Sequence, residues 1–304
     1  MKRNMEWKQG LVSVIIPTYK RSDMLGRAIE SVLGQTYDQI EALVVDDNIP
    51  GSPESQDVYR IVSGYQESGK VFYVGQKEHI NGAVARNAGI AQSQAEYIAF
   101  LDDDEEWHPE KVEKQVAYLA ANPQVAGVSC LYSNYRGGRV VASIQPYDGE
   151  QLQLKILTGQ VTVHASTFLC RHDTLNQSGA FHPALLRHQD LQMFVDFLNY
   201  GSIHPICEDL VKNHIDSEMN RPNVERLIQV KQAYFQAIGE TVRGYGKKEK
   251  RRIRNAHLFE IIFIALKQRK WGVALKYLLM LRPDVASIRD LKIRWHFRGT
   301  VKAK

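Results

Sequence analysis

Short apolar runs alternate with amphipathic stretches along the first hundred residues of this 304-residue chain. The runs at 12–16, 42–45, 71–74 and 97–101 are rich in β-branched and aromatic residues, which predicts four β-strands. Strands that alternate with helices form a mostly parallel sheet with helices on both faces. The pattern therefore predicts a Rossmann-like α/β domain.

Helical periodicity fills the intervals between these runs. Apolar residues recur three and four positions apart after Ser22, a residue type that caps helices. The segments 81–92 and 109–121 are also helical in pattern, and proline opens the second of them. We expect three helices here.

Beyond residue 123 the pattern becomes mixed. It predicts strands at 125–132, 161–169 and 203–207, a glycine turn at 137–138 and a helix at 189–200. From residue 224 onward the periodicity is helical throughout. We therefore expect an α/β domain over residues 1–218 and an α-helical extension over 219–304.

Charge divides the chain near the same place. Residues 242–304 contain 18 Lys and Arg against four Asp and Glu, a net charge of +14, so the other 241 residues carry about −9. We expect a basic face formed by Arg226, Lys231, Arg243 and residues 247–254. The apolar side chains of 258–266 lie beside it, so these helices either rest on an anionic bilayer or pack on the first domain.

Cysteines and apolar runs indicate the compartment. The three cysteines, Cys130, Cys170 and Cys207, have no C-x-x-C spacing, which fits neither a disulfide framework nor a zinc site. No apolar run of signal-peptide length follows the basic N-terminus, and the most apolar run, 259–266, is far shorter than the roughly 20 residues that cross a bilayer. We expect a cytoplasmic protein, at most peripheral on the inner face of the plasma membrane.

The strongest chemical feature is the acidic triad Asp102, Asp103 and Asp104, directly after the strand predicted at 97–101. Adjacent carboxylates repel one another, and a divalent cation relieves that repulsion. Ligands of open α/β sheets bind beyond the carboxyl ends of the strands, and oxygen ligands suit Mg²⁺ or Mn²⁺. The alternative is a solvated acidic turn before the next helix.

Two other predicted strands end in polar or aromatic residues. Asp46 and Asp47 end the second strand, and Pro17, Thr18 and Tyr19 end the first. If these strands are adjacent, their ends share one crevice with the triad, where an aromatic ring and a carboxylate suit a nucleobase. The alternatives are that Tyr19 covers the edge of the core and that Asp47 forms a turn.

Small residues surround Arg86 in the helix predicted at 81–92. They permit close approach of another backbone, while Arg86 can reach a phosphate. The alternative is a tightly packed helix in which Arg86 forms an ion pair with the acidic triad.

Taken together, these motifs resemble the family 2 inverting glycosyltransferases, which have the GT-A fold. The resemblance covers roughly residues 11 to 215. The matching motifs are VSVIIPTY at 12–19, VDD at 45–47, the small-residue and Ala-Arg-Asn-x-Gly stretch at 81–89, and 97–104 followed by Trp107, Pro109 and Lys111.

The resemblance implies a role for each motif, with a nucleoside, usually uridine, and its diphosphate held at the strand ends. The implied donor-binding residues are Pro17, Thr18, Tyr19, Asp46, Asp47, Arg86, Asp102 and Asp103. The implied metal ligands are Asp102, Asp104 and a late histidine, His214. His164 and His188 also lie where the acceptor or the metal could be reached. A surface or hydrogen-bonded histidine is the alternative for each of the three.

The family's second acidic motif, Glu-Asp at the start of a helix, is present as Gln189-Asp190. Asp190 is then the expected general base, because inversion in one displacement requires an acceptor hydroxyl deprotonated opposite the leaving diphosphate. Gln189 departs from the family pattern. The alternative for Asp190 is a first-turn carboxylate that stabilises its helix.

The resemblance also implies the partners. The donor would be a UDP-sugar, the cation Mn²⁺ or Mg²⁺, and the acceptor a saccharide or lipid-linked saccharide of bacterial capsule, O-antigen or exopolysaccharide. The chain lacks the Gln-x-x-Arg-Trp motif and the membrane spans of chain-polymerising members, which favours a non-processive enzyme. Two other classes compete. A basic nucleic-acid-binding protein leaves the acidic strand ends unexplained, and a sugar nucleotidyltransferase would carry a glycine-rich loop where residues 17–21 contain no glycine.

Overall fold

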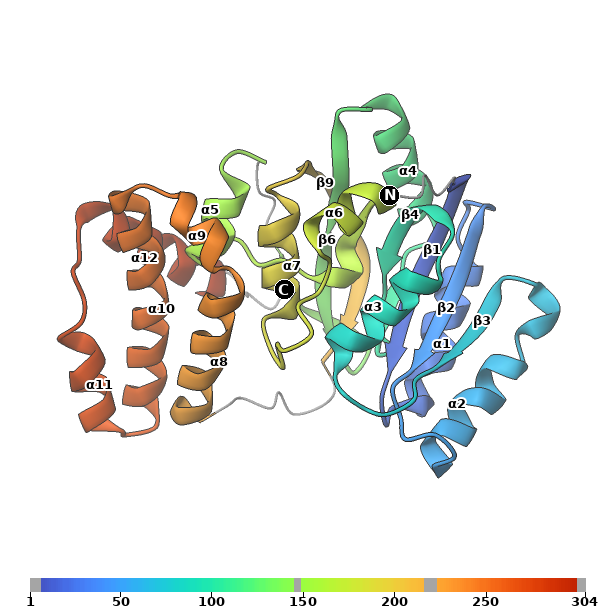
Figure 1. The fold of residues 1–304 in the computed structure, drawn as a ribbon, viewed down its shortest axis with the longest axis horizontal. Coiled ribbons are helices and arrows are strands. Elements are labelled where there is room, and N and C mark those ends of the chain that lie inside the picture. The colour runs from blue at the N-terminus through green and yellow to red at the C-terminus, as the bar shows by residue number, and fades with distance from the viewer. Residues whose placement is uncertain (1–6, 145–148, 216–222, 300–304) are drawn as a thin grey trace, which may run out of the picture.

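The structure is a computed structural model that describes residues 7–144, 149–215 and 223–299. Its centre is a nine-stranded sheet of order β3-β2-β1-β4-β8-β6-β9-β5, with β7 paired to β6 (Figure 1). The strands are β1 (Lys8–Thr18), β2 (Ile40–Asp46), β3 (Val71–Gly75), β4 (Ala95–Phe100), β5 (Glu105–Trp107), β6 (Val125–Arg136), β7 (Arg139–Ser143), β8 (Phe168–Arg171) and β9 (Ser202–His214).

The direction of the strands decides which ends meet. Strands β1 to β4 are mutually parallel, as the alternating pattern predicts. Strand β8 is antiparallel to both β4 and β6, and β9 is parallel to β6, so β6 and β9 run in the same direction as β4. The carboxyl ends of β1, β2, β4 and β9 therefore lie at one edge of the sheet.

Helices cover both faces of this sheet, as predicted. The helices of this region are α1 (Ser22–Leu33), α2 (Pro53–Ser63), α3 (Gly82–Gln92), α4 (Lys111–Ala121), α5 (Leu152–Leu157), α6 (His172–Ser178) and α7 (Gln189–Phe197). Buried side chains of α1, α2 and α4 share one core with the sheet, and those of α3, α5, α6 and α7 share the other. This mixed α/β architecture agrees with the predicted GT-A fold.

Helix α3 approaches the sheet closely because of a glycine. A Cβ on Gly89 would lie 2.6 Å from Ile15 Cγ2 on β1 and 3.1 Å from Val45 Cγ2 on β2. The helix begins at its cap, where the Asn81 side chain accepts hydrogen bonds from the backbone of residues 83 and 84. The small residues of this segment thus fix the position of Arg86.

Several local predictions need correction. Residues 161–167, predicted as strand, form a loop and a short 3₁₀ turn, and only β8 is extended. Helix α2 and strand β5 were not predicted. Strand β5 has only three residues, two of them acidic, so it has no apolar alternation that would reveal it. Ser22 is the first residue of α1, and the cap position falls on Arg21, without a side-chain cap bond.

The C-terminal region is helical, as predicted. It contains α8 (Val224–Ala237), α9 (Gly239–Gly244), α10 (Lys247–Lys267), α11 (Trp271–Leu278) and α12 (Val285–Gly299), which stand at the left of Figure 1. The predicted domain boundary at 218/219 lies outside the described residues.

These helices pack on the sheet domain. Of the two alternatives for the apolar side chains at 258–262, the structure shows packing, and the prediction that Lys231 lies on the basic face is wrong. Tyr234, Ile238 and Ile253 are buried in the core that α7 shares. Leu258, Ile261 and Ile262, the candidates for membrane contact, are also buried. Lys231, predicted on the basic face, is buried and lies 2.9 Å from Glu260. Within the described residues, no helix is both long and apolar enough to cross a membrane.

Candidate active site

The acidic triad directly follows β4 at the carboxyl edge of the sheet. Two backbone hydrogen bonds hold it in position. The N–H of Leu101 donates to the Ile15 carbonyl at 3.0 Å, and the N–H of Asp102 donates to Ser166 Oγ at 3.0 Å. Asp103 is fully buried, whereas Asp102 and Asp104 are partly exposed. A rigid core strand therefore presents this group of carboxylates at its end.

Two arginines lie against the triad. Arg21, just after β1, contacts Asp104 and lies 2.9 Å from Asp103. Arg86 of α3 pairs with Asp102. The sequence predicts a cation that relieves the repulsion among the triad, and these two guanidinium groups already supply part of that relief. Arg21 is half exposed, so its pairing is the more easily exchanged of the two.

The surroundings shift the acidity of these groups in different directions. Burial raises the pKa of Asp103 to about 7, despite the nearby Arg21. Burial also favours the neutral form of Asp102, but its contact with Arg86 prevails and holds the pKa of that carboxyl below its usual value. Asp102 is therefore the triad member that stays ionised most readily.

Asp102 also belongs to a group that the sequence analysis did not predict. One ligand atom each from Asp102, Glu105 and His164 lies within 4.8 Å of the others. Glu105 is buried, its Oε1 lies 3.2 Å from His164 Nε2, and its Oε2 has no hydrogen-bond partner among the described residues. Two carboxylates and an imidazole suit Mn²⁺, so these residues fit the metal that the resemblance implies.

The other predicted metal ligands have different partners. Asp104 contacts Arg21. His214, at the end of β9, lies 3.5 Å from Glu106 and packs against Tyr135. Asp102 is thus common to the predicted set and to the group that includes Glu105 and His164.

The ends of β1 and β2 form a second part of the crevice. Tyr19 stacks on His79, with ring centres 3.8 Å apart, and His79 Nδ1 lies 2.9 Å from Asp47 Oδ2. In the pairing of β1 with β2, Pro17 is opposite Val45 and Thr18 is opposite Asp46. The strand ends therefore bring an aromatic ring, an imidazole and a carboxylate together.

Asp46 differs from Asp47 in its contacts. Its carboxylate accepts hydrogen bonds from Asn48 backbone and side chain, from Ser55 Oγ at 2.7 Å and from the Tyr73 hydroxyl at 2.8 Å. With these donors in place, Asp46 holds the loop after β2, and Asp47 is the carboxylate beside Tyr19 and His79.

Asp190 lies in the first turn of α7, and its Oδ2 accepts a hydrogen bond from the backbone N–H of Ala165 at 3.2 Å. The preceding Gln189 accepts from Arg86 Nη1 at 3.2 Å and donates to the Leu185 carbonyl at 2.7 Å. Arg86 thus joins the triad to the start of α7. The family's glutamate is replaced here by a neutral side chain that still reaches this arginine.

The residues missed from sequence lie outside the predicted strand ends. His79 precedes α3 and was not considered. His164 was considered, but in a segment predicted as strand and without Glu105 as its neighbour. Arg21 closely follows the motif at 12–19, and Glu105 directly follows the acidic triad. This closeness in sequence was the only indication that they belong to the site. Their roles become visible only when the loops are placed.

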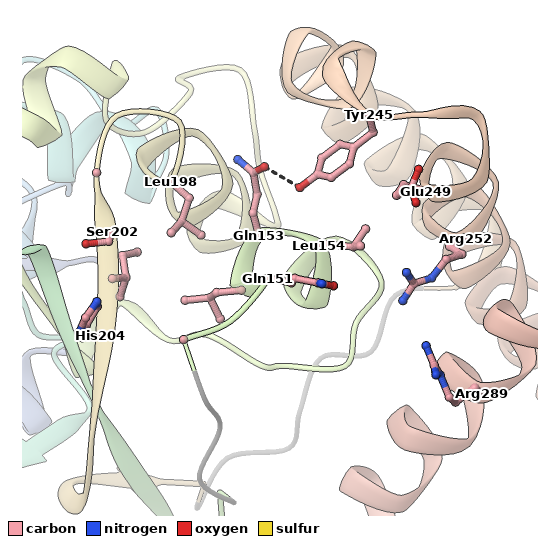
Figure 2. A pocket seen from close by; sticks show the side chains of 14 residues that line it. Gln151, Gln153, Leu154, Leu198, Ser202, His204, Tyr245, Glu249, Arg252 and Arg289 are labelled. Atoms are coloured by element: carbon pink, nitrogen blue, oxygen red, sulfur yellow. Dashed lines mark hydrogen bonds between the residues drawn. The ribbon is translucent and has the colours of Figure 1, made fainter.

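A separate cavity lies near the C-terminal end of α7. Figure 2 shows this pocket of about 860 Å³ between the sheet domain and the C-terminal helices, with Tyr245 donating a hydrogen bond to Gln153. Its lining includes Leu198, just past the end of α7, and Ser202, the first residue of β9. None of the predicted site residues lines it. About 12 Å of helix separates Leu198 from Asp190, so the cavity is distinct from the carboxyl-edge site.

Comparison with known sequences identifies the family. The model of the family described as Glycosyl transferase family 2 matches residues 13–179, more than half of the chain. The chain belongs to glycosyl transferase family 2. The family and fold predicted from the motifs are thereby confirmed.

Curated relatives are also named glycosyltransferases. An uncharacterized glycosyltransferase of Rickettsia conorii is 29% identical over 224 residues, which are 70% of this chain and 35% of the relative. A putative teichuronic acid biosynthesis glycosyltransferase of Bacillus subtilis is 35% identical over 113 residues, 37% of this chain and 43% of that protein. The chain spans about a third of the length of the first of these relatives and less than half of the second.

Solved structures share the fold. TarS residues 1–349 of S. aureus, in complex with UDP-GlcNAc, match with a TM-score of 0.69 at 17% identity, over 88% of this chain and 79% of that chain. A mannosyltransferase of Pyrobaculum calidifontis, in complex with GDP-Man and Mn²⁺, matches with a TM-score of 0.59 at 15% identity, over 94% and 84% of the two chains. This family member therefore has the architecture of GT-A glycosyltransferases.

Proposed function

We propose that this chain is an inverting, non-processive glycosyltransferase that moves a hexose-type sugar from a UDP-sugar to a saccharide or lipid-linked saccharide. The observation that carries the proposal is that Arg86 joins Asp102, at the end of β4, to Gln189, beside Asp190 at the start of α7. A group suited to a diphosphate thus lies between a cluster suited to a cation and a carboxylate suited to a base. The UDP-GlcNAc that TarS binds supports the choice of uridine.

The strand ends supply the proposed nucleoside site. Tyr19 offers a ring face to a pyrimidine, and Asp47 offers an acceptor to its ring N–H. Pro17 and Thr18 end β1 against β2 and set the position of Tyr19. Asp46 contributes by holding the loop after β2. Asp103 lies beside the ribose position in this assignment.

The proposed cation is Mn²⁺ or Mg²⁺, held by Asp102 with either Asp104 and His214 or Glu105 and His164. When bound, it neutralises the charge that develops on the departing diphosphate. The arginines act on the same charge from the protein: Arg86 contacts the triad from α3, and the half-exposed Arg21 can turn from Asp104 toward a phosphate.

Asp190 is the proposed general base. It accepts the proton of the acceptor hydroxyl while the oxygen attacks the anomeric carbon opposite the diphosphate, so the configuration inverts in one step. The hydrogen bond from Ala165 leaves other lone pairs of the carboxylate for this proton. Gln189 keeps the Arg86 side chain beside the base without adding a second negative charge.

We also propose that the enzyme works on a bacterial surface polysaccharide at the inner face of the plasma membrane. The names of the relatives support this assignment, since one is named a putative teichuronic acid biosynthesis glycosyltransferase and another an amylovoran biosynthesis glycosyltransferase. The basic C-terminal helices suit an anionic surface where lipid-linked acceptors lie.

The test is turnover of sugar donors by purified protein with a bacterial membrane extract as acceptor. UDP-GlcNAc, UDP-glucose, UDP-galactose and GDP-mannose are each supplied with Mn²⁺, and release of the nucleoside diphosphate is followed. The proposal predicts release from a UDP-sugar that stops when a chelator is added. Release from none of these donors, with wild-type protein that remains folded, would reject it.

A further inference from the structure

Exposed apolar side chains gather at one end of the molecule. Among the residues that the structure describes, sixteen large apolar side chains are exposed, and nine of them lie between residues 263 and 288. On α11, Trp271 is 66% exposed, Leu275 58% and Leu278 53%, and Leu279 just beyond the helix is 79% exposed. Positions 271, 275 and 278 form one stripe of a helix, so the exposed residues share a face.

The face of α11 beside this stripe is packed, so the helix is well anchored. Ala274 is buried against Ile261 and Ala265 of α10, and Val273 and Tyr277 pack beside it. The helix therefore has two apolar faces, and only the inner one is covered in the described part of the chain. Figure 1 shows α11 as the outermost helix, at the opposite end of the long axis from α2.

The segment that contains α11 is basic, and its basic side chains are exposed. Residues 261–282 include five basic residues and no acidic residue. They are Lys267, Arg269, Lys270, Lys276 and Arg282. The acidic residues on either side are already paired, Glu260 with Lys231 and Asp284 with Arg251. An occupant of the uncovered face must therefore tolerate both apolar contact and positive charge.

We propose that α11 lies in the interface of an anionic lipid bilayer, with Trp271, Leu275, Leu278 and Leu279 inserted among the headgroups and upper acyl chains. An amphipathic helix with an apolar stripe and basic flanks binds such surfaces, and tryptophan is favoured at the interface. A second copy of this chain is a poorer occupant, because its five basic residues would oppose five of the same sign.

This inference rests on the peripheral attachment proposed above and on no part of the transfer chemistry. It also replaces the stripe at 258–262 as the membrane contact, since those side chains are buried. Vesicle binding and UDP binding can therefore be measured separately, and the failure of one leaves the other unaffected.

The experiment is sedimentation of the full chain with vesicles of phosphatidylcholine alone and of phosphatidylcholine with phosphatidylglycerol. Wild type is expected to bind the second kind only, and less at high salt. Leu275→Glu with Leu279→Glu should weaken binding at least about tenfold. Replacing Lys267, Arg269 and Lys276 together by Gln should weaken it roughly a hundredfold.

A matched control is Val140→Glu on β7, a substitution of a side chain that is 45% exposed far along the chain from α11. It should leave vesicle binding unchanged, and circular dichroism should show all variants folded. The proposal is overturned if wild type ignores anionic vesicles or if the leucine variant binds them equally well. A dimer in solution that the leucine variant dissociates, without vesicle binding, would assign the face to a second copy.

Discussion

The carboxyl edge of the sheet and the outer face of α11 depart from the usual distribution of side chains in opposite ways. At the sheet edge, Asp103 and Glu105 are buried although they are acidic. On α11, Leu275 and Leu279 are exposed although they are apolar. Burying carboxylates costs folding free energy that the neighbouring arginines offset in part, and the exposed leucines gain nothing from burial unless a ligand covers them. The two proposals follow from this difference: a charged small molecule at the first place and a lipid surface at the second.

Asp190→Asn should produce the largest effect on the first region. Removal of a general base slows the reaction by about 10²–10⁴-fold, whereas UDP binding should change by less than about twofold. Asp173→Asn is a matched control, because Asp173 is also a first-turn carboxylate, on α6. Transfer rates and UDP affinity, measured side by side, check this. Full transfer by Asp190→Asn would exclude it as the base.

Two histidine variants distinguish the two sets of metal ligands. The group formed by Asp102, Glu105 and His164 predicts that His164→Ala weakens Mn²⁺ binding about 10–100-fold while His214→Ala leaves it nearly unchanged. If the ligands are instead Asp102, Asp104 and His214, His214→Ala should weaken Mn²⁺ binding and His164→Ala should leave it nearly unchanged. Titration with Mn²⁺ in the presence of UDP decides between them.

Lys111 is a buried charged residue outside the proposed ligand sites, so its effect on stability can be compared with that of the buried carboxylates. Its Nζ donates to Gln115 and lies 3.8 Å from the centre of the Trp107 ring, and burial lowers its pKa to about 8. The unfolded chain holds this proton up to its ordinary pKa of 10.5, so stability should rise between pH 8 and pH 10.5.

Lys111→Met should remove that rise, which is on the order of 1–3 kcal/mol. Lys114→Met is the control, because Lys114 is on the same helix and pairs with Glu110 and Glu208 at the surface. Urea unfolding at pH 7.5 and pH 10 measures the difference. An equal rise in wild type and Lys111→Met would contradict the assignment.

Alanine substitutions at two glycines compare how tightly α3 and α11 are packed. Gly89→Ala places a Cβ 2.6 Å from Ile15 Cγ2 and should lower the free energy of unfolding by about 1–3 kcal/mol. Gly272→Ala on α11 meets nothing within 4 Å and should raise it by up to about 1 kcal/mol, the gain in helix propensity. Thermal unfolding of both variants is sufficient. Equal effects would mean that α3 is packed no more tightly than α11.

Sequence alone predicted the first four strands and the acidic triad, because both depend on local pattern and on motifs in a fixed order. It did not predict β5, whose strand conformation depends on pairing of Glu105 with Asn213, far along the chain. It left open whether Leu258 contacts a membrane or the first domain, and it placed Lys231 on the surface, since periodicity does not tell which of two apolar neighbours covers a helix. His164 and His79 reach the site through loops, and loop paths are set by tertiary packing.

The central claim is that a divalent cation at Asp102 and the strand ends together bind a uridine diphosphate. Calorimetric titration of UDP, GDP and ADP with Mn²⁺, then with chelator, tests it in wild type and Asp102→Ala, with Asp173→Ala as control. The account predicts that UDP binds wild type and Asp173→Ala only when Mn²⁺ is present, and that Asp102→Ala does not bind it. UDP binding that persists in chelator and in Asp102→Ala, or no binding of any diphosphate to the wild type, would contradict it.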